Sequence, residues 1–251
     1  MNFALNETQV MIRRTVREYA AEHIAPYSAE WDRTETFPAE AVSGLGRLGI
    51  TGLVFPQRYG GGDGDMVSFV VALEELAKVD AAVAVTVAVV SSLCGSLLIE
   101  YGSDEQKDRW LKPLADGEAI AAFGLTEPEA GSDVAGIATR ADLDGDEWVI
   151  TGAKSFITNA GTPLTSFVIV AAVTGKKADG SNELSNIIVP TGAPGFSVGE
   201  PYKKLGWRAS DTRPIHLERC RVPKDHLLGT EGRGLNQFLF ALDGARVGLS
   251  A

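Results

Sequence analysis

The first hundred residues place their hydrophobic side chains mainly at helical spacing. Asn6 and Gln9 are three residues apart, as in a capping box that begins a helix. Apolar and aromatic side chains follow at about one-turn intervals: Val10, Ile12, Val16 and Tyr19. We expect this first helix to end before Pro26.

The same spacing predicts three further helices. One spans residues 38–48, with Pro38 in its first turn and Gly49 after its end. An amphipathic helix covers residues 66–78, and a short one covers 104–111, before Pro113. Residues 55–65 are rich in glycine and predict a loop.

One segment, residues 81–99, contains no charged side chain. A run of this length could span a membrane. It carries small and hydroxyl side chains, however, and Asp80 and Glu100 bracket it without basic or aromatic anchors. We therefore predict a buried core helix.

From about residue 119 the pattern changes to short β-type runs separated by turn residues. The runs lie at residues 148–150, 167–173, 187–189, 196–198 and 215–222. After the loop LLGTEGRG, helical spacing returns through Leu235, Phe238, Leu239, Leu242 and Val247, and it continues to the last residue, Ala251.

These patterns predict an α+β fold in three parts. Residues 1–118 form an N-terminal α-helical domain, and residues 119–230 form a β-barrel-like middle domain, which contains the two segments of candidate chemistry described below. Residues 231–251 form the first helix of a third, helical domain, and we expect that domain to be truncated here.

Composition narrows the class of protein. The chain has 251 residues, 45% of them hydrophobic, and a formal net charge of -10, which argues against a nucleic-acid partner. Cys94 and Cys220 form neither a disulfide framework nor a metal-binding pattern, and the three histidines (His23, His216 and His226) have no metal-ligand neighbours. With no secretory signal visible, we expect a cytoplasmic protein that binds no metal.

Two segments carry candidate chemistry. In FGLTEPEAGSD, residues 123–133, an apolar strand runs into a turn of small residues whose amides could approach a flavin carbonyl or a phosphate. An ordinary Pro/Gly turn is the alternative. The second segment, KSFITNAG at residues 154–161, also fits a plain buried strand.

Together these segments resemble the two flavin motifs of the acyl-CoA dehydrogenase family, TEPxAGSD and K-x-W/F-I-T-N. Further stretches resemble the same family in the same order: LGITGLVFPQRYGG, YGSDEQKDRWLKPLADGE, GWRASDTR and VPKDHLL. The resemblance covers the whole chain, and it implies FAD as the cofactor.

The resemblance also assigns roles. Phe123, Leu125 and Thr126 would meet the flavin ring, and Gly131 and Ser132 would lie near the cofactor phosphates and the CoA moiety. In the second motif, Phe156 would pack on the flavin and Thr158 would bond near its N5 atom. Ile157, which lies between them, is also an expected cofactor-binding residue. Many relatives have Trp where this chain has Phe156.

Near the end, LDGAR resembles the family segment that touches the CoA part of the substrate. Asp243 and Arg246 are therefore candidate substrate contacts, although their spacing also fits an ion pair on a helix surface. Some relatives carry the catalytic Glu directly before this Arg, where this chain has Ala245. We expect the base to lie beyond Ala251, and the chain as given to be inactive.

The implied reaction is FAD-dependent α,β-dehydrogenation of an acyl-CoA thioester to a trans-2-enoyl-CoA, in fatty acid or amino acid catabolism. The resemblance further implies electron-transfer flavoprotein as the electron acceptor and a homotetramer. An acyl-CoA oxidase or flavin monooxygenase of the same fold is an alternative, and so is a non-catalytic subunit that binds acyl-CoA or flavin. Periodicity does not predict the acyl chain length, because it does not fix which residues of 81–99 face the flavin.

Overall fold

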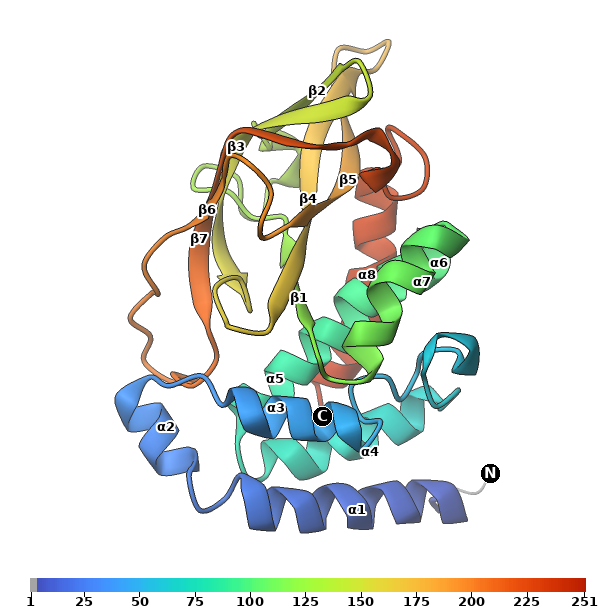
Figure 1. Ribbon diagram of the computed structural model, residues 1–251, viewed down its shortest axis with the longest axis vertical. Helices are drawn as coiled ribbons and strands as arrows, with labels where there is room; N and C mark the ends of the chain where they lie inside the picture. The colour runs from blue at the N-terminus through green and yellow to red at the C-terminus, as the bar shows by residue number, and fades with distance from the viewer. Residues whose placement is uncertain (1–3) are drawn as a thin grey trace.

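The computed structural model describes residues 4–251, as a layer of helices beside a curled sheet (Figure 1). The first helix, α1 (Glu7–His23), begins at the predicted capping box: the Gln9 amide donates to Asn6 Oδ1 at 2.8 Å, and the Asn6 amide donates to Gln9 Oε1 at 3.0 Å. It ends before Pro26, as predicted. The capping residues therefore set where the helical layer starts.

The next helices are α2 (Ser28–Thr34), α3 (Ala39–Arg47) and α4 (Met66–Ala77). We did not predict α2, which buries no side chain and so lacks a clear apolar stripe. Pro38 is the N-cap residue of α3, one position before the first turn in which we expected it. The loop at residues 55–65 is confirmed, with one short 3-10 turn at Gln57–Tyr59.

The predicted end of the short helix at residue 111 is wrong. Helix α7 (Asp104–Ala115) continues through Pro113. Proline removes one backbone hydrogen bond and strains a helix interior. Here Leu111, Leu114 and Ala115 are buried beneath the sheet, and we attribute the extra turn to that packing.

The uncharged run forms a continuous buried helix of three parts: α5 (Ala81–Ala88), a π-helical segment η2 (Val89–Gly95), and α6 (Ser96–Tyr101). By length and composition it could cross a membrane, but 78% of its most apolar window is buried inside the structure. It is a core helix of this fold, as predicted.

The sheet has the strands β1 (Ile120–Gly124), β2 (Arg140–Asp144), β3 (Glu147–Thr158), β4 (Thr165–Lys176), β5 (Asn182–Pro190), β6 (Phe196–Val198) and β7 (Thr212–Pro223). Their order is β1-β4-β2-β3-β7-β6, with β5 also paired to β4. The expected β-region is present as a curled mixed sheet, in which β1 and β4 are parallel. Strand β2 was not predicted, because four of its five residues are exposed.

The last helix, α8 (Gly234–Leu249), joins the two layers. Phe238 is fully buried, and its ring meets the Phe123 ring edge-on at 4.3 Å. Figure 1 shows α8 running down from the β5 end of the sheet into the helical layer. This arrangement brings the ends of β1 and β3 close to η2 and α8.

Candidate functional site

A cavity of about 220 Å³ lies where the sheet, η2 and α8 meet. Its lining consists of Val89, Leu93, Phe123, Leu125, Thr126, Phe156, Ile157, Thr158 and Leu242. Six of the eight residues that the sequence assigned to a cofactor are in this set. The two predicted motifs, about thirty residues apart in the chain, thus face one space.

Phe156 departs from the buried strand that was its alternative interpretation. It lies in a bulge of β3, where the pairing with β7 shifts between Lys154 and Ile157, and its φ is 60°. The bulge leaves the Phe156 side chain 64% exposed, stacked on Tyr202 with the ring centroids 4.7 Å apart. A bulge re-aims a side chain, and left-handed backbone at a non-glycine residue is typical of functional sites.

Thr126 and Thr158 supply the polar atoms of the cavity lining. Both residues are half-buried, and neither hydroxyl makes a hydrogen bond within residues 4–251. A hydroxyl can donate one hydrogen bond and accept others. The cavity therefore combines an aromatic face and aliphatic walls with two hydroxyls available to a planar polar ligand.

The other predicted residues lie outside this lining. Gly131 and Ser132 are exposed in the loop before the 3-10 turn Val134–Gly136. Asp243 and Arg246 form the ion pair that was their alternative, with Arg246 Nη1 2.5 Å from Asp243 Oδ1 on the exposed side of α8. The structure brings neither pair into the cavity.

Sequence reasoning missed Val89, Leu93 and Leu242, the aliphatic walls of the cavity, and Tyr202, which supports Phe156. Val89 and Leu93 belong to η2, so the π-helical segment sets which side of the uncharged run faces the cavity. Such segments often mark functional sites, but an apolar run gives no sign of one in the sequence.

A buried ion pair joins the two motifs, with one partner from each. Lys154 Nζ is 2.7 Å from Glu127 Oε1, and the two side chains are 0% and 6% exposed. Burial lowers the pKa of Lys154 to about 8, against the opposing effect of Glu127. Burial would raise the pKa of Glu127, but the hydrogen bonds that Glu127 accepts, chiefly from Lys154, hold it below its ordinary value. Both groups are therefore charged near neutral pH.

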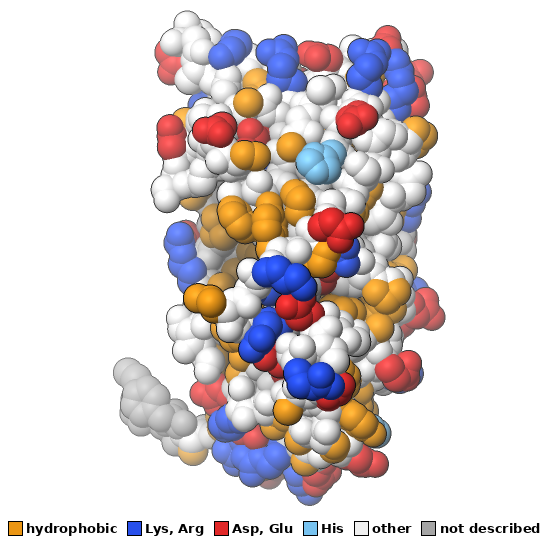
Figure 2. Space-filling model, turned by 90° about the vertical axis from the view of Figure 1, so that its left-hand side faces the viewer, with side chains coloured by type: hydrophobic (Ala, Val, Ile, Leu, Met, Phe, Trp, Pro, Cys, Tyr) orange, Lys and Arg blue, Asp and Glu red, His pale blue; other side chains and the backbone are white. Residues whose placement is uncertain are grey.

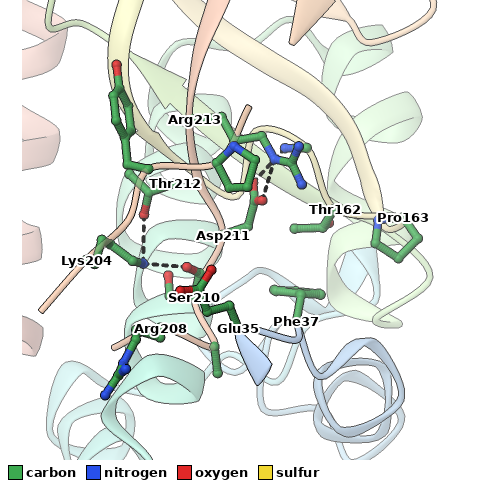
Figure 3. Close-up of a pocket in the computed structure, with 14 residues that line it drawn as sticks. Glu35, Phe37, Thr162, Pro163, Lys204, Arg208, Ser210, Asp211, Thr212 and Arg213 are labelled. Carbon is green, nitrogen blue, oxygen red and sulfur yellow. Dashed lines mark hydrogen bonds and ion pairs between the residues drawn. The ribbon is translucent and has the colours of Figure 1, made fainter. Parts of the chain in front are cut away.

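A second cavity, of about 130 Å³, lies between the loop that precedes β7 and the segment linking α2 to α3 (Figure 3). In it Lys204 Nζ donates to the Ser210 carbonyl and the Thr212 hydroxyl, and Arg213 pairs with Asp211 at 2.6 Å. Figure 2 shows the side of the molecule on the left of Figure 1, where basic side chains lie at mid-height beside a hollow lined with hydrophobic ones. Each described cation that lines this cavity, Lys204, Arg208 and Arg213, has a hydrogen-bond or ion-pair partner within the protein. The cavity is therefore a polar contact region between the two segments.

Two family models match the chain. The acyl-CoA dehydrogenase N-terminal domain matches residues 6–118, and the acyl-CoA dehydrogenase middle domain matches residues 122–220.

Individual relatives agree with the family models. Over its full length, the chain is 46% identical to a probable acyl-CoA dehydrogenase, YngJ, of Bacillus subtilis, and it covers 66% of that protein. Among solved structures, it is similar to butyryl-CoA dehydrogenase from Megasphaera elsdenii, with a TM-score of 0.94 and 37% identity, covering 100% of this chain and 66% of that one. A glutaryl-CoA dehydrogenase from Mycobacterium smegmatis in complex with FADH2 has a TM-score of 0.89 and 36% identity, covering 98% of this chain and 61% of that one. The chain thus spans slightly less than two thirds of the length of these proteins.

Proposed function

The chain belongs to the acyl-CoA dehydrogenase family, and on that premise we propose that it forms the FAD-binding part of an enzyme that oxidises an acyl-CoA thioester to the trans-2-enoyl-CoA. One observation carries the proposal: both candidate flavin motifs line one cavity, in which two hydroxyls and an exposed aromatic ring are available. This convergence supports a flavin site over the two alternative interpretations, a fortuitous turn and a plain buried strand.

The residues present fit a flavin ring. Phe156 offers its exposed face for packing against the ring, in keeping with the offset stacking that aromatic systems prefer. Thr126 and Thr158 offer hydroxyls to the polar edge of the ring. When bound, FAD supplies the acceptor for the hydride that leaves the β carbon of the substrate.

The aliphatic walls of the cavity would contact the substrate instead of the flavin. Val89 and Leu93 from η2, with Leu242 from α8, give an apolar boundary suited to an acyl chain and to the exclusion of water. Gly131 and Ser132 remain our proposed contacts near the cofactor phosphates and the CoA moiety, and Asp243 and Arg246 remain our proposed contacts for the CoA moiety. Breaking the Asp243–Arg246 ion pair costs little, because both side chains are exposed.

The cavity lining binds and orients but supplies no general base. No carboxylate belongs to this lining within the described residues, and Ala245 is 2% exposed. The family resemblance further supports electron-transfer flavoprotein as the acceptor, a homotetramer and a cytoplasmic location as parts of the proposal.

Anaerobic titration with butyryl-CoA of the FAD-loaded full-length protein, which would carry the base that we expect beyond Ala251, tests the reaction. We expect stoichiometric bleaching of the flavin absorbance and formation of the 2-enoyl-CoA. Flavin that binds but is not bleached by any acyl-CoA of a length series would contradict the dehydrogenase and favour the binding subunit. Rapid peroxide formation when the reduced protein meets air would favour the oxidase.

A further inference from the structure

Lys154 is the unusual residue of strand β3. It is fully buried, on a strand where Ser155 and Ile157 are also buried, and within residues 4–251 the only carboxylate bonded to it is Glu127. Its aliphatic stem lies against Gly124, where a Cβ would be 3.5 Å from Lys154 Cγ. A charge at such a position costs free energy unless hydrogen bonds and an opposite charge compensate for it.

The contacts of the pair run to both candidate flavin segments. Lys154 Nζ donates to the Leu125 carbonyl at 3.1 Å as well as to Glu127, and the amide of Ser155 donates to the Thr126 carbonyl at 2.9 Å. In a trans peptide the C=O and N–H point in opposite directions. Fixing the Leu125 carbonyl therefore also fixes the direction of the Thr126 N–H.

Glu127 completes the link. Its carboxylate accepts from the amides of Ala138 at 2.7 Å and Thr139 at 3.0 Å, in the segment that leads into β2. The pair thus ties three stretches of backbone together. Two of them continue, within one or two residues, into Leu125, Thr126 and Phe156 in the cavity lining.

Stability alone is a poor explanation for this pair. A buried ion pair is often no more stabilising than apolar residues of similar volume, whereas removing one partner leaves an uncompensated charge. What apolar side chains cannot reproduce is the directional hydrogen bond to the Leu125 carbonyl. The arrangement therefore indicates that the pair fixes the position of the backbone around Leu125 and Thr126.

We propose that Glu127 and Lys154 are positioning residues that hold the Leu125–Thr126 and Phe156–Thr158 segments in the relative placement that the flavin requires. The pair touches no reacting atom and acts through the backbone of these segments. This inference rests on the proposed function, because it assumes that the cavity binds flavin.

The decisive variant is the double substitution Glu127→Gln with Lys154→Met. Methionine fills a similar volume without charge, and glutamine keeps an oxygen that can accept from the amide of Ala138 or Thr139. We expect this variant to unfold within a few degrees of the wild type, whereas Lys154→Met alone is clearly less stable. Its FAD dissociation constant should nevertheless rise at least about tenfold, with a changed flavin absorption spectrum and midpoint potential.

Glu75→Gln is the matched control. Glu75 is also a buried carboxylate, held by Arg17 and Lys78, but it lies in α4 and does not line the cavity. The control should lose stability while keeping the FAD affinity and the flavin spectrum of the wild type. If the double variant does not fold, Glu127→Gln alone is compared with Glu75→Gln by the same readouts.

The outcomes separate the two proposals. Wild-type affinity and an unchanged spectrum in the double variant, or in Glu127→Gln when that variant is used, would overturn the positioning role and leave the flavin site standing. Equal losses of FAD affinity in Glu127→Gln and Glu75→Gln would also overturn it. A wild-type protein that binds no FAD would overturn the proposed function, and the positioning role with it.

Discussion

Replacing Glu75 with glutamine removes a buried carboxylate that two cations hold on helix α4. Glu75 is 3% exposed and accepts from Arg17 at 2.8 and 3.0 Å and from Lys78 at 2.7 Å. The hydrogen bond from Arg17, opposed by burial and helped by Lys78, lowers the pKa of Glu75 from 4.5 to about 2. A pKa shift is worth about 1.4 kcal/mol per pH unit, so the lowered pKa limits the contribution of the Glu75 charge to the free energy of unfolding to about 3 kcal/mol. Both cations are more than half exposed, so screening reduces it to about 1.5 kcal/mol.

The sign of the pH dependence follows from the lowered pKa. The stabilisation is fully present above pH 4.5, the ordinary value, and is lost as the pH falls toward about 2. Urea unfolding followed by far-UV circular dichroism should show Glu75→Gln about 1.5 kcal/mol less stable near neutral pH, a gap that narrows by about 1 kcal/mol near pH 3.5. Glu18→Gln, at an exposed position, should match the wild type at both pH values. A gap that stays constant with pH, or no gap at neutral pH, would refute the reasoning.

Three further substitutions test the cavity and the helical packing. Phe156→Ala removes an exposed ring stacked on Tyr202, so fluorescence titration should show FAD affinity about tenfold weaker while the melting temperature hardly changes. Val89→Phe in the full-length protein fills part of the cavity, so kcat/KM measured across an acyl-CoA series should shift toward shorter chains; an unchanged ratio of kcat/KM between short and long chains would place the acyl chain elsewhere. Gly44→Ala would place a Cβ 1.9 Å from the Tyr19 hydroxyl and should cost about 1–3 kcal/mol in urea unfolding; wild-type stability would show that the tyrosine moves aside freely.

Local sequence signals predicted most elements whose ends depend on local chemistry. The Asn6 capping box fixes the start of α1, and the lack of charge between Asp80 and Glu100 fits a buried helix. Helix α7 passes through Pro113 because tertiary packing outweighs a local rule. Strand β2 is held by pairing with β3, and its largely exposed residues leave no apolar pattern to read.

The sequence likewise predicted part of the candidate site: the residues within recognisable motifs, but not the contacts that depend on the folded sheet. Family motifs identified Thr126 and Thr158, and the structure shows that both line one cavity. The bulge at Phe156 depends on the register with β7, which no alternation in the sequence reveals. The Glu127–Lys154 contact joins residues 27 positions apart, so it too requires the folded sheet.

The central claim is that the two motifs together hold a flavin, and it is tested most directly by changing Thr126 and Thr158 together to valine. Valine keeps the volume and removes only the hydroxyls of two residues that line the cavity. The purified double variant should fold normally and lose the bound FAD and its yellow colour. A variant that retains stoichiometric FAD with an unchanged absorption spectrum would contradict this account.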